Sequence, residues 1–202
     1  MRLRKVGSSR LLCWDLESRP LAFWYDGATT AEITAFGWKW SDERGVRTLL
    51  LQADGLFLND SGETLNDTSA YQTFVAELSA AGLVYGHNIR SFDLPLLNAG
   101  LLRRKLRPLP RLLTTDTLRD YPKRKDMSAS LENLAKVYGI QAGGTGKKHM
   151  ATLDWEQANR LTPEGVMRAR ERVVSDVRLQ EKLRRRLLDE GLLGPPKMWG
   201  PS

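Results

Sequence analysis

Two carboxylates stand close together near the start of the sequence. Asp15 and Glu17 follow the apolar run at residues 11–14, which is typical of a short buried strand. Residues two apart in a strand point to the same face of the sheet, so these side chains are expected to be neighbours. Like charges this close raise each other's pKa, and a divalent ion such as Mg²⁺ or Mn²⁺ resolves the conflict through carboxylate oxygens. An exposed acidic pair at a strand end is the simpler alternative.

Two further acids occur in settings that could bring them to the same place. Asp93 follows a short apolar strand at residues 83–86 and a polar turn, where it opens a helix. An acid there also suits the helix dipole without any further role. Asp176 lies near the edge of the apolar stripe of a long helix predicted over residues 162–190, and a half-exposed helical aspartate is the alternative.

The elements that must position these acids alternate between strands and helices. Strands are predicted at residues 33–40 and 46–51, joined by a turn, and a helix at 68–81. A helix over residues 91–99 is expected to end at Gly100, and a glycine- and lysine-rich loop precedes the long C-terminal helix. This pattern predicts a mixed sheet with helices packed on it. We expect an N-terminal extension at 1–9, one domain at 10–190 and a disordered tail at 191–202.

Composition narrows the class of protein. The chain has 202 residues, which suits one domain, and its net charge of +7 favours a polyanionic partner such as nucleic acid. The single cysteine excludes an internal disulfide and a cysteine-rich zinc site. Apolar runs are too short to span a bilayer, and the basic start is not followed by an apolar signal segment. We therefore expect a cytoplasmic protein.

Taken in order, these motifs resemble a known family. The strand-borne Asp-x-Glu is followed by His87-Asn88-x-x-x-Phe92-Asp93 and by the late helical Asp176. Three more pieces match it: residues 115–118 (Thr-Asp-Thr-Leu), residues 130–135 (Ser-Leu-Glu-Asn-Leu-Ala) and Trp155. Over roughly residues 10–188 the sequence resembles the DEDD, or DnaQ-like, 3′–5′ exonucleases of the ribonuclease H-like superfamily. The resemblance implies an α/β fold with a mixed five-stranded sheet flanked by helices.

The resemblance also implies a two-metal site. Asp15 would bridge two divalent ions, Mg²⁺ or Mn²⁺, with Glu17 and Asp176 completing the first site and Asp93 serving the second, largely through water. A further set of residues would contact the substrate: Leu16, Ser18, His87, Asn88, Phe92, Lys147 and Lys148. Of these, Phe92 is expected to pack rather than to stack on a base.

One position departs from the family pattern. The family carries a tyrosine four residues before its last aspartate, or a histidine five before, and here these positions are Arg172 and Glu171. Arginine is not a general base, because its pKa exceeds about 12. Arg172 could instead contact the scissile phosphate or a water as part of the catalytic set. The alternative is that it points to solvent or pairs with a nearby acid.

The predicted function is metal-dependent 3′–5′ exonuclease activity on single-stranded DNA or frayed 3′ ends, in a proofreading or repair setting. The partner would be single-stranded nucleic acid, DNA ahead of RNA, with replication or repair proteins as further candidates. The same site could serve an exoribonuclease. A nucleic-acid-binding protein with a degenerate nuclease site, or a basic adaptor on the same fold, are the alternatives from other classes.

Overall fold

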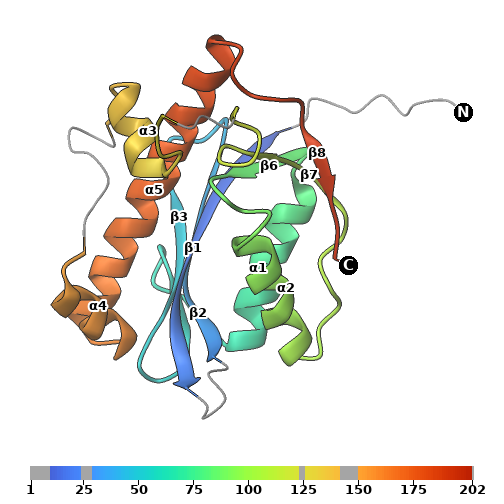
Figure 1. The fold of residues 1–202 in the computed structure, drawn as a ribbon. Coiled ribbons are helices and arrows are strands. Elements are labelled where there is room, and N and C mark those ends of the chain that lie inside the picture. The colour runs from blue at the N-terminus through green and yellow to red at the C-terminus, as the bar shows by residue number, and fades with distance from the viewer. Residues whose placement is uncertain (1–9, 24–28, 123–125, 142–149, 202) are drawn as a thin grey trace, which may run out of the picture.

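The computed structural model describes residues 10–23, 29–122, 126–141 and 150–201, and the predicted N-terminal extension lies outside them. These residues form a mixed sheet flanked by helices (Figure 1). The strands are β1 (Leu11–Phe23), β2 (Thr29–Trp40), β3 (Arg47–Leu51), β4 (Phe57–Asn59), β5 (Thr64–Leu65), β6 (Leu83–Gly86), β7 (Leu112–Asp116) and β8 (Lys197–Trp199). The helices are α1 (Asp67–Ala80), α2 (Asp93–Arg103), α3 (Leu131–Val137), α4 (Thr152–Asn159) and α5 (Pro163–Asp189).

The sheet has the strand order β5-β4-β3-β2-β1-β6-β7-β8. The first five strands in the chain pair in antiparallel fashion, whereas β1, β6 and β7 run parallel to one another. This confirms the predicted α/β class with a mixed sheet. Over the described residues the sheet has eight strands where five were expected, because β4, β5 and β8 are each two or three residues long. Such short strands show no periodicity in the sequence.

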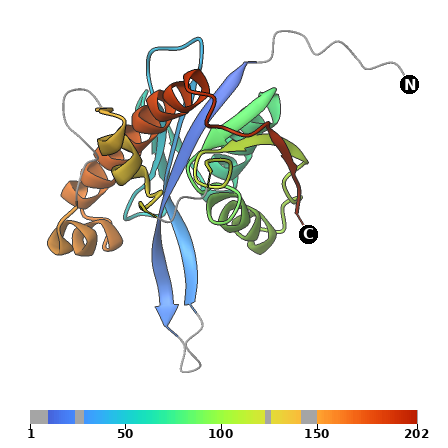
Figure 2. The same cartoon turned by 45° about the horizontal axis from the view of Figure 1, so that its top comes forward.

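Strand β1 is the central strand of the site, and it is longer than predicted. The apolar run ends at Trp14, but antiparallel pairing with β2 continues to Phe23, with a register shift between Glu17 and Ser18. Figure 2 shows β1 and β2 extending together beyond the rest of the sheet. The pairing keeps Asp15 and Glu17 inside regular strand, so both point to one face.

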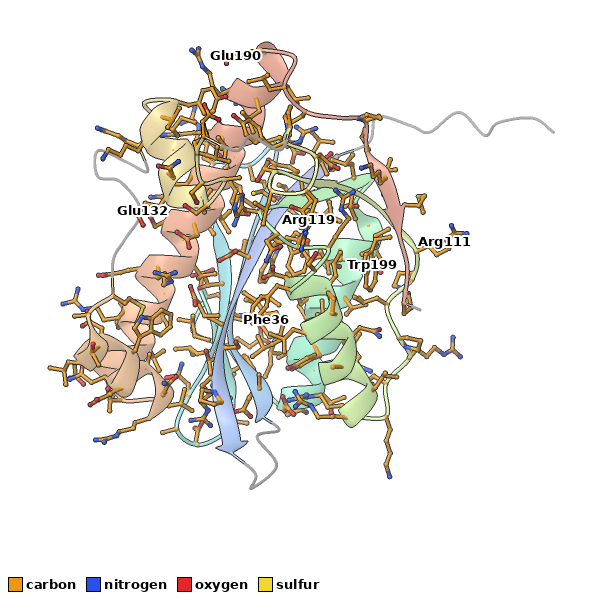
Figure 3. All side chains as sticks on the ribbon, in the orientation of Figure 1. Phe36, Arg111, Arg119, Glu132, Glu190 and Trp199 are labelled. Carbon is orange, nitrogen blue, oxygen red and sulfur yellow. The ribbon has the colours of Figure 1, made fainter. Side chains whose placement is uncertain are left out.

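The two faces of the sheet are covered by different helices. Helices α1 and α2 lie on one face, and α3, α4 and α5 on the other (Figure 1). On the first face, Trp14 packs against Phe74 with ring centroids 5.5 Å apart, and Phe36 is fully buried between sheet and helices (Figure 3). On the second face, Cys13 packs with Val177 of α5. The acidic residues of β1 therefore face α5.

Both ends of helix α5 are marked by residues that favour the start and the end of a helix. Thr162 caps its N-terminus by accepting from the Gly165 N–H, Pro163 occupies the first turn, and Gly191 follows with φ +66°. Its predicted apolar stripe is buried, and Asp176 is buried with it at 4% exposure. Helix α5 thus places the carboxylate of Asp176 in the interface between the helix and the sheet.

The end of helix α2 and the C-terminal segment differ from what the sequence predicted. Helix α2 continues through Gly100 to Arg103, because that glycine serves packing: a Cβ there would lie 2.6 Å from Tyr71 Cε1. The C-terminal segment, expected to be disordered, contains β8, which pairs antiparallel with β7. Among the described residues, no helix combines the length and apolar character needed to cross a membrane.

Candidate functional site

A cavity of about 390 Å³ opens beside the central strand. Among the described residues, four acids line it, which we call the acidic cluster: Asp15, Glu17, Asp93 and Asp176. The remaining lining residues come from β1, the turn before α2, the turn after β7, the start of α3, and α5: Leu16, His87, Asn88, Phe92, Leu118, Ser130, Leu131, Arg172 and Gln180. The topology thus brings the acids predicted from separate motifs to one place.

Three members of the cluster are close enough to share one ion. Carboxylate oxygens of Asp15, Glu17 and Asp176 all lie within 4.8 Å of one another. Two come from one face of β1, and the third comes from α5, which crosses that face. The donor set is entirely carboxylate oxygen, which suits a hard divalent ion such as Mg²⁺ or Mn²⁺. The residues present therefore fit a metal ion.

The acidic cluster has the electrostatics of a site that needs a cation. Burial raises the pKa of Asp15 well above its usual range, and the three neighbouring carboxylates add to that rise. Asp93, at the first position of α2 and 4% exposed, has its pKa raised to about 7, mainly by burial and then by Glu17. Hydrogen bonds from the backbones of Asp93 and Leu16 oppose this rise. Each shift means that the charged form is disfavoured without a counter-ion.

Gln180 is a site residue that no motif in the sequence indicated. Its Nε2 donates to Asp15 Oδ1 at 2.8 Å, and the residue is 1% exposed. This hydrogen bond orients the carboxylate and lowers its pKa, against the other contributions. The spacing could have identified it, since Gln180 lies four residues after Asp176 and therefore on the same helix face.

Arg172 points into the cluster rather than to solvent. Its Nε donates to Glu17 Oε1 at 2.8 Å, and its terminal nitrogen lies 3.9 Å from Asp176 Oδ2. The Trp155 ring of α4 faces this guanidinium, whose carbon lies 5.0 Å from the centre of the ring. Among the alternatives stated for Arg172, the structure therefore shows pairing with nearby acids.

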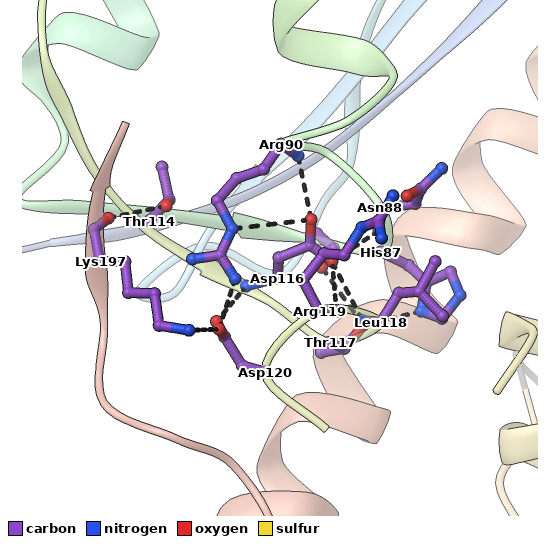
Figure 4. A network of polar contacts seen from close by, with 11 residues as sticks. His87, Asn88, Arg90, Thr114, Asp116, Thr117, Leu118, Arg119, Asp120 and Lys197 are labelled. Atoms are coloured by element: carbon purple, nitrogen blue, oxygen red, sulfur yellow. Dashed lines mark hydrogen bonds and ion pairs between the residues drawn. The ribbon is translucent and has the colours of Figure 1, made fainter. Parts of the chain in front are cut away.

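Asp116 holds the turn that carries the predicted substrate-binding residues (Figure 4). It is fully buried, and its carboxylate accepts backbone N–H groups on two turns: those of Asn88 and Arg90, and those of Leu118 and Arg119. Asn88 has a left-handed backbone with φ 65°, a conformation that costs free energy for a non-glycine residue. The carboxylate compensates by satisfying the backbone donors of that turn.

A second acid connects this turn to the C-terminal strand. Asp120 accepts from the Asp116 backbone N–H at 2.9 Å and forms an ion pair with Arg90. Lys197 of β8 lies 3.3 Å from Asp120 Oδ1 (Figure 4). Through Asp120 and Asp116, the edge strand β8 is thereby linked to the turn that carries His87 and Asn88.

Other predicted site residues fall into three groups. Leu16, His87 and Asn88 line the cavity, and His87 Nδ1 lies 2.9 Å from Thr117 Oγ1. Phe92 also lines it and is 52% exposed, which leaves its side chain open to a bound nucleotide. Ser18 lies beyond the register shift in β1 and is not among the described residues that line the cavity. Lys147 and Lys148 lie outside the described residues.

The comparisons with known proteins support the fold alone. The sequence matches no known protein-family profile, and no curated protein matches it. Among solved structures, the family B DNA polymerase from the hyperthermophilic archaeon Pyrobaculum calidifontis is similar, with a TM-score of 0.59 at 16% sequence identity. The similarity covers 90% of this chain and 25% of the polymerase chain. At this identity the two share a fold, which does not fix a shared activity.

Proposed function

We propose that this chain is a metal-dependent 3′–5′ exonuclease that releases nucleotides from single-stranded DNA or frayed 3′ ends. The observation that carries the proposal is the convergence of the acidic cluster, supplied by β1, α2 and α5, on one cavity. Gathering four acids in a buried site costs folding free energy unless cations offset the repulsion. The order of the motifs and the DNA polymerase with a similar fold favour phosphodiester chemistry on DNA.

The proposed roles of the acids follow from their places in the cavity. Two Mg²⁺ or Mn²⁺ ions, when bound, would supply an activated water and stabilise the leaving 3′ oxygen. Asp15 would bridge both ions, held in orientation by Gln180. Glu17 and Asp176 would complete the first ion's ligands, and Asp93 would serve the second.

Other residues that line the cavity would hold the terminal nucleotide. Leu16, His87 and Asn88 present a mixed apolar and polar surface to the cavity. Phe92, exposed at its rim, would stack on a base, because aromatic faces bind bases with little sequence preference. Lys147 and Lys148 would contact the backbone phosphates of the strand.

A second candidate function, nucleic-acid binding by a degenerate nuclease site, is favoured by one observation. Arg172 already donates to Glu17, a proposed metal ligand, and such a contact is what a degenerate nuclease that only binds nucleic acid would show. An exoribonuclease with the same site is a variant of the leading proposal, and it would differ in a partner for the 2′-hydroxyl.

The test is digestion of 5′-labelled oligonucleotides of DNA and of RNA with Mg²⁺ or Mn²⁺. We expect a ladder that shortens from the 3′ end of DNA, disappears with EDTA, and is absent for Asp15→Asn. Asp54→Asn is the matched control, because Asp54 is an exposed turn residue whose side chain accepts from Leu56 N–H. A wild-type protein that binds the oligonucleotide without shortening it would favour the degenerate-site alternative, and equal digestion by Asp15→Asn would refute the assignment of the site.

A further inference from the structure

In the proposed enzyme, Glu17 would interact with two cations, the guanidinium of Arg172 and a bound metal ion. Its carboxylate lies in the three-acid group that could hold a metal, and its Oε1 accepts the Arg172 Nε–H at 2.8 Å. The sharing rests on metal binding by this cluster, as in the proposed function. Arg172 stands at the position where the family pattern that this sequence resembles has a tyrosine.

The contact between Arg172 and Glu17 is well shielded. The side chains are 18% and 11% exposed, respectively, so water screens the pair less than it would at the surface. The positive guanidinium of Arg172 neutralises part of the negative charge that a metal ion would otherwise bind.

The guanidinium is also fixed in place. Trp155 of α4 lies under it at 5.0 Å, and Asp176, one helical turn further along α5, lies 3.9 Å from its terminal nitrogen. Stacking on an aromatic ring and hydrogen bonding to a carboxylate restrain the side chain, which lowers the entropic cost of keeping it there. A restrained cation competes more effectively with a metal than a mobile one.

We propose that Arg172 competes with the divalent metal ion for Glu17, and that a substrate phosphate relieves this competition. When a metal ion takes Glu17, the guanidinium needs a new anionic partner beside the cavity. A phosphate of the nucleic acid supplies one, because its oxygens match the planar fork of arginine. Metal and substrate then bind cooperatively, and Arg172 is the residue that couples them.

The test measures Mn²⁺ affinity by electron paramagnetic resonance, without any turnover. We expect Arg172→Met to bind Mn²⁺ at least about tenfold more tightly than the wild type, which corresponds to about 1.4 kcal/mol. Adding thymidine 5′-monophosphate should tighten Mn²⁺ binding by the wild type and leave Arg172→Met unchanged. Equal Mn²⁺ affinity in wild type and variant, with or without the nucleotide, would overturn the proposal.

A matched control and a second variant keep the result specific. Arg168→Met removes the same charge one turn earlier on α5, where the side chain is 47% exposed and pairs with Asp154 and Glu171. It should leave Mn²⁺ affinity unchanged, and an equal gain there would reduce the effect to net charge and overturn the proposal. In Arg172→Met, the further change Glu17→Gln should cancel the gain, because Glu17 is the shared ligand. Persistence of the gain would place the competition elsewhere.

A measurement on the wild type gives an independent readout. The Arg172 Nε–H, identified in a nitrogen-15 spectrum by its loss in Arg172→Lys, should exchange slowly while it donates to Glu17. Saturating Mg²⁺ should shift this signal and speed its exchange, and an unchanged signal would refute the competition. Oligonucleotide digestion tests the proposed function separately, since a protein can show this coupling and still fail to cleave DNA.

Discussion

Val173 packs directly on Gly37, so closely that a Cβ atom on Gly37 would lie 2.7 Å from Val173 Cγ2. Gly37 is the residue of β2 that faces Asp15 in the register of the sheet. Val173 lies between Arg172 and Asp176 on α5. This contact therefore sets how near the helix-borne acid comes to the strand-borne acids.

The first prediction concerns that spacing. Gly37→Ala should destabilise the fold by about 1–3 kcal/mol, because Val173 is fully buried and stiff in its rotamer. It should also lower nuclease activity more than the stability loss explains, since α5 must shift away from β1. Urea denaturation and single-turnover digestion at a temperature where the variant is folded measure the two effects.

The double variant tests the cause. Val173→Ala in the Gly37→Ala background frees the space that the added methyl needs, so activity should recover toward the wild type. Strictly additive losses in the two variants would show that the close approach does not set the geometry of the site.

Much of this site could be predicted from the sequence. Asp15 and Glu17 follow an apolar strand, Asp93 opens a helix after a strand, and Asp176 lies on a helix with a clear apolar stripe. Each is a local pattern, and the order of the motifs placed them together. Pairing of Arg172 with a nearby acid was one of several alternatives, because the direction of a long side chain depends on neighbours distant in sequence.

The supports of the site could not be predicted in the same way. Asp116 serves backbone donors on two separate turns, which no spacing in the sequence reveals. Strand β8 has three residues, and its composition alone predicts disorder. Its order comes from pairing with β7, a contact between segments distant in sequence. The exposure of Phe92 depends on the orientation of the turn before α2, which no local pattern in the sequence predicts.

The second prediction concerns pH in the absence of metal. The folded state raises the pKa of Asp93 from 3.8 to about 7, so the folded protein binds this proton more tightly than the unfolded chain. The resulting stabilisation is complete below about pH 4 and is lost as the pH rises through 7. Each tenfold difference in proton affinity between the folded and unfolded states corresponds to about 1.4 kcal/mol. In EDTA, the free energy of unfolding should fall over this range.

Asp93→Asn tests the assignment of that slope. The variant has no proton to lose at this position, so its free energy of unfolding should vary less between about pH 4 and 7. Urea denaturation at several pH values gives the curve, with Asp54→Asn as the control that keeps the wild-type slope. If Asp93→Asn keeps the full slope, another group is responsible.

The third prediction concerns the rim of the cavity. Phe92→Ala should raise the KM for single-stranded oligonucleotides roughly tenfold, because base stacking on an aromatic side chain contributes about 1–3 kcal/mol. The melting temperature should hardly change, since the side chain is 52% exposed. Leu102→Ala is the control, because Leu102 is 54% exposed on α2, the helix that Phe92 precedes, and is not among the described residues that line the cavity. A KM that is unaltered in Phe92→Ala would remove stacking from the proposal.

The last prediction separates positioning from stability at Asp116. Asp116→Asn exchanges one acceptor oxygen for an amide that cannot accept, so backbone donors of the buried turns lose a partner. We expect a loss of about 1–3 kcal/mol in the free energy of unfolding. Because Asn88 and Asp93 are held by the same turn, the single-turnover rate should fall as well, even where the variant is fully folded. Asp60→Asn is the matched comparison: Asp60 accepts the Thr48 N–H and hydroxyl away from the cavity, so its loss should lower stability alone. If both variants lose stability and neither loses rate, Asp116 supports the fold without positioning the site.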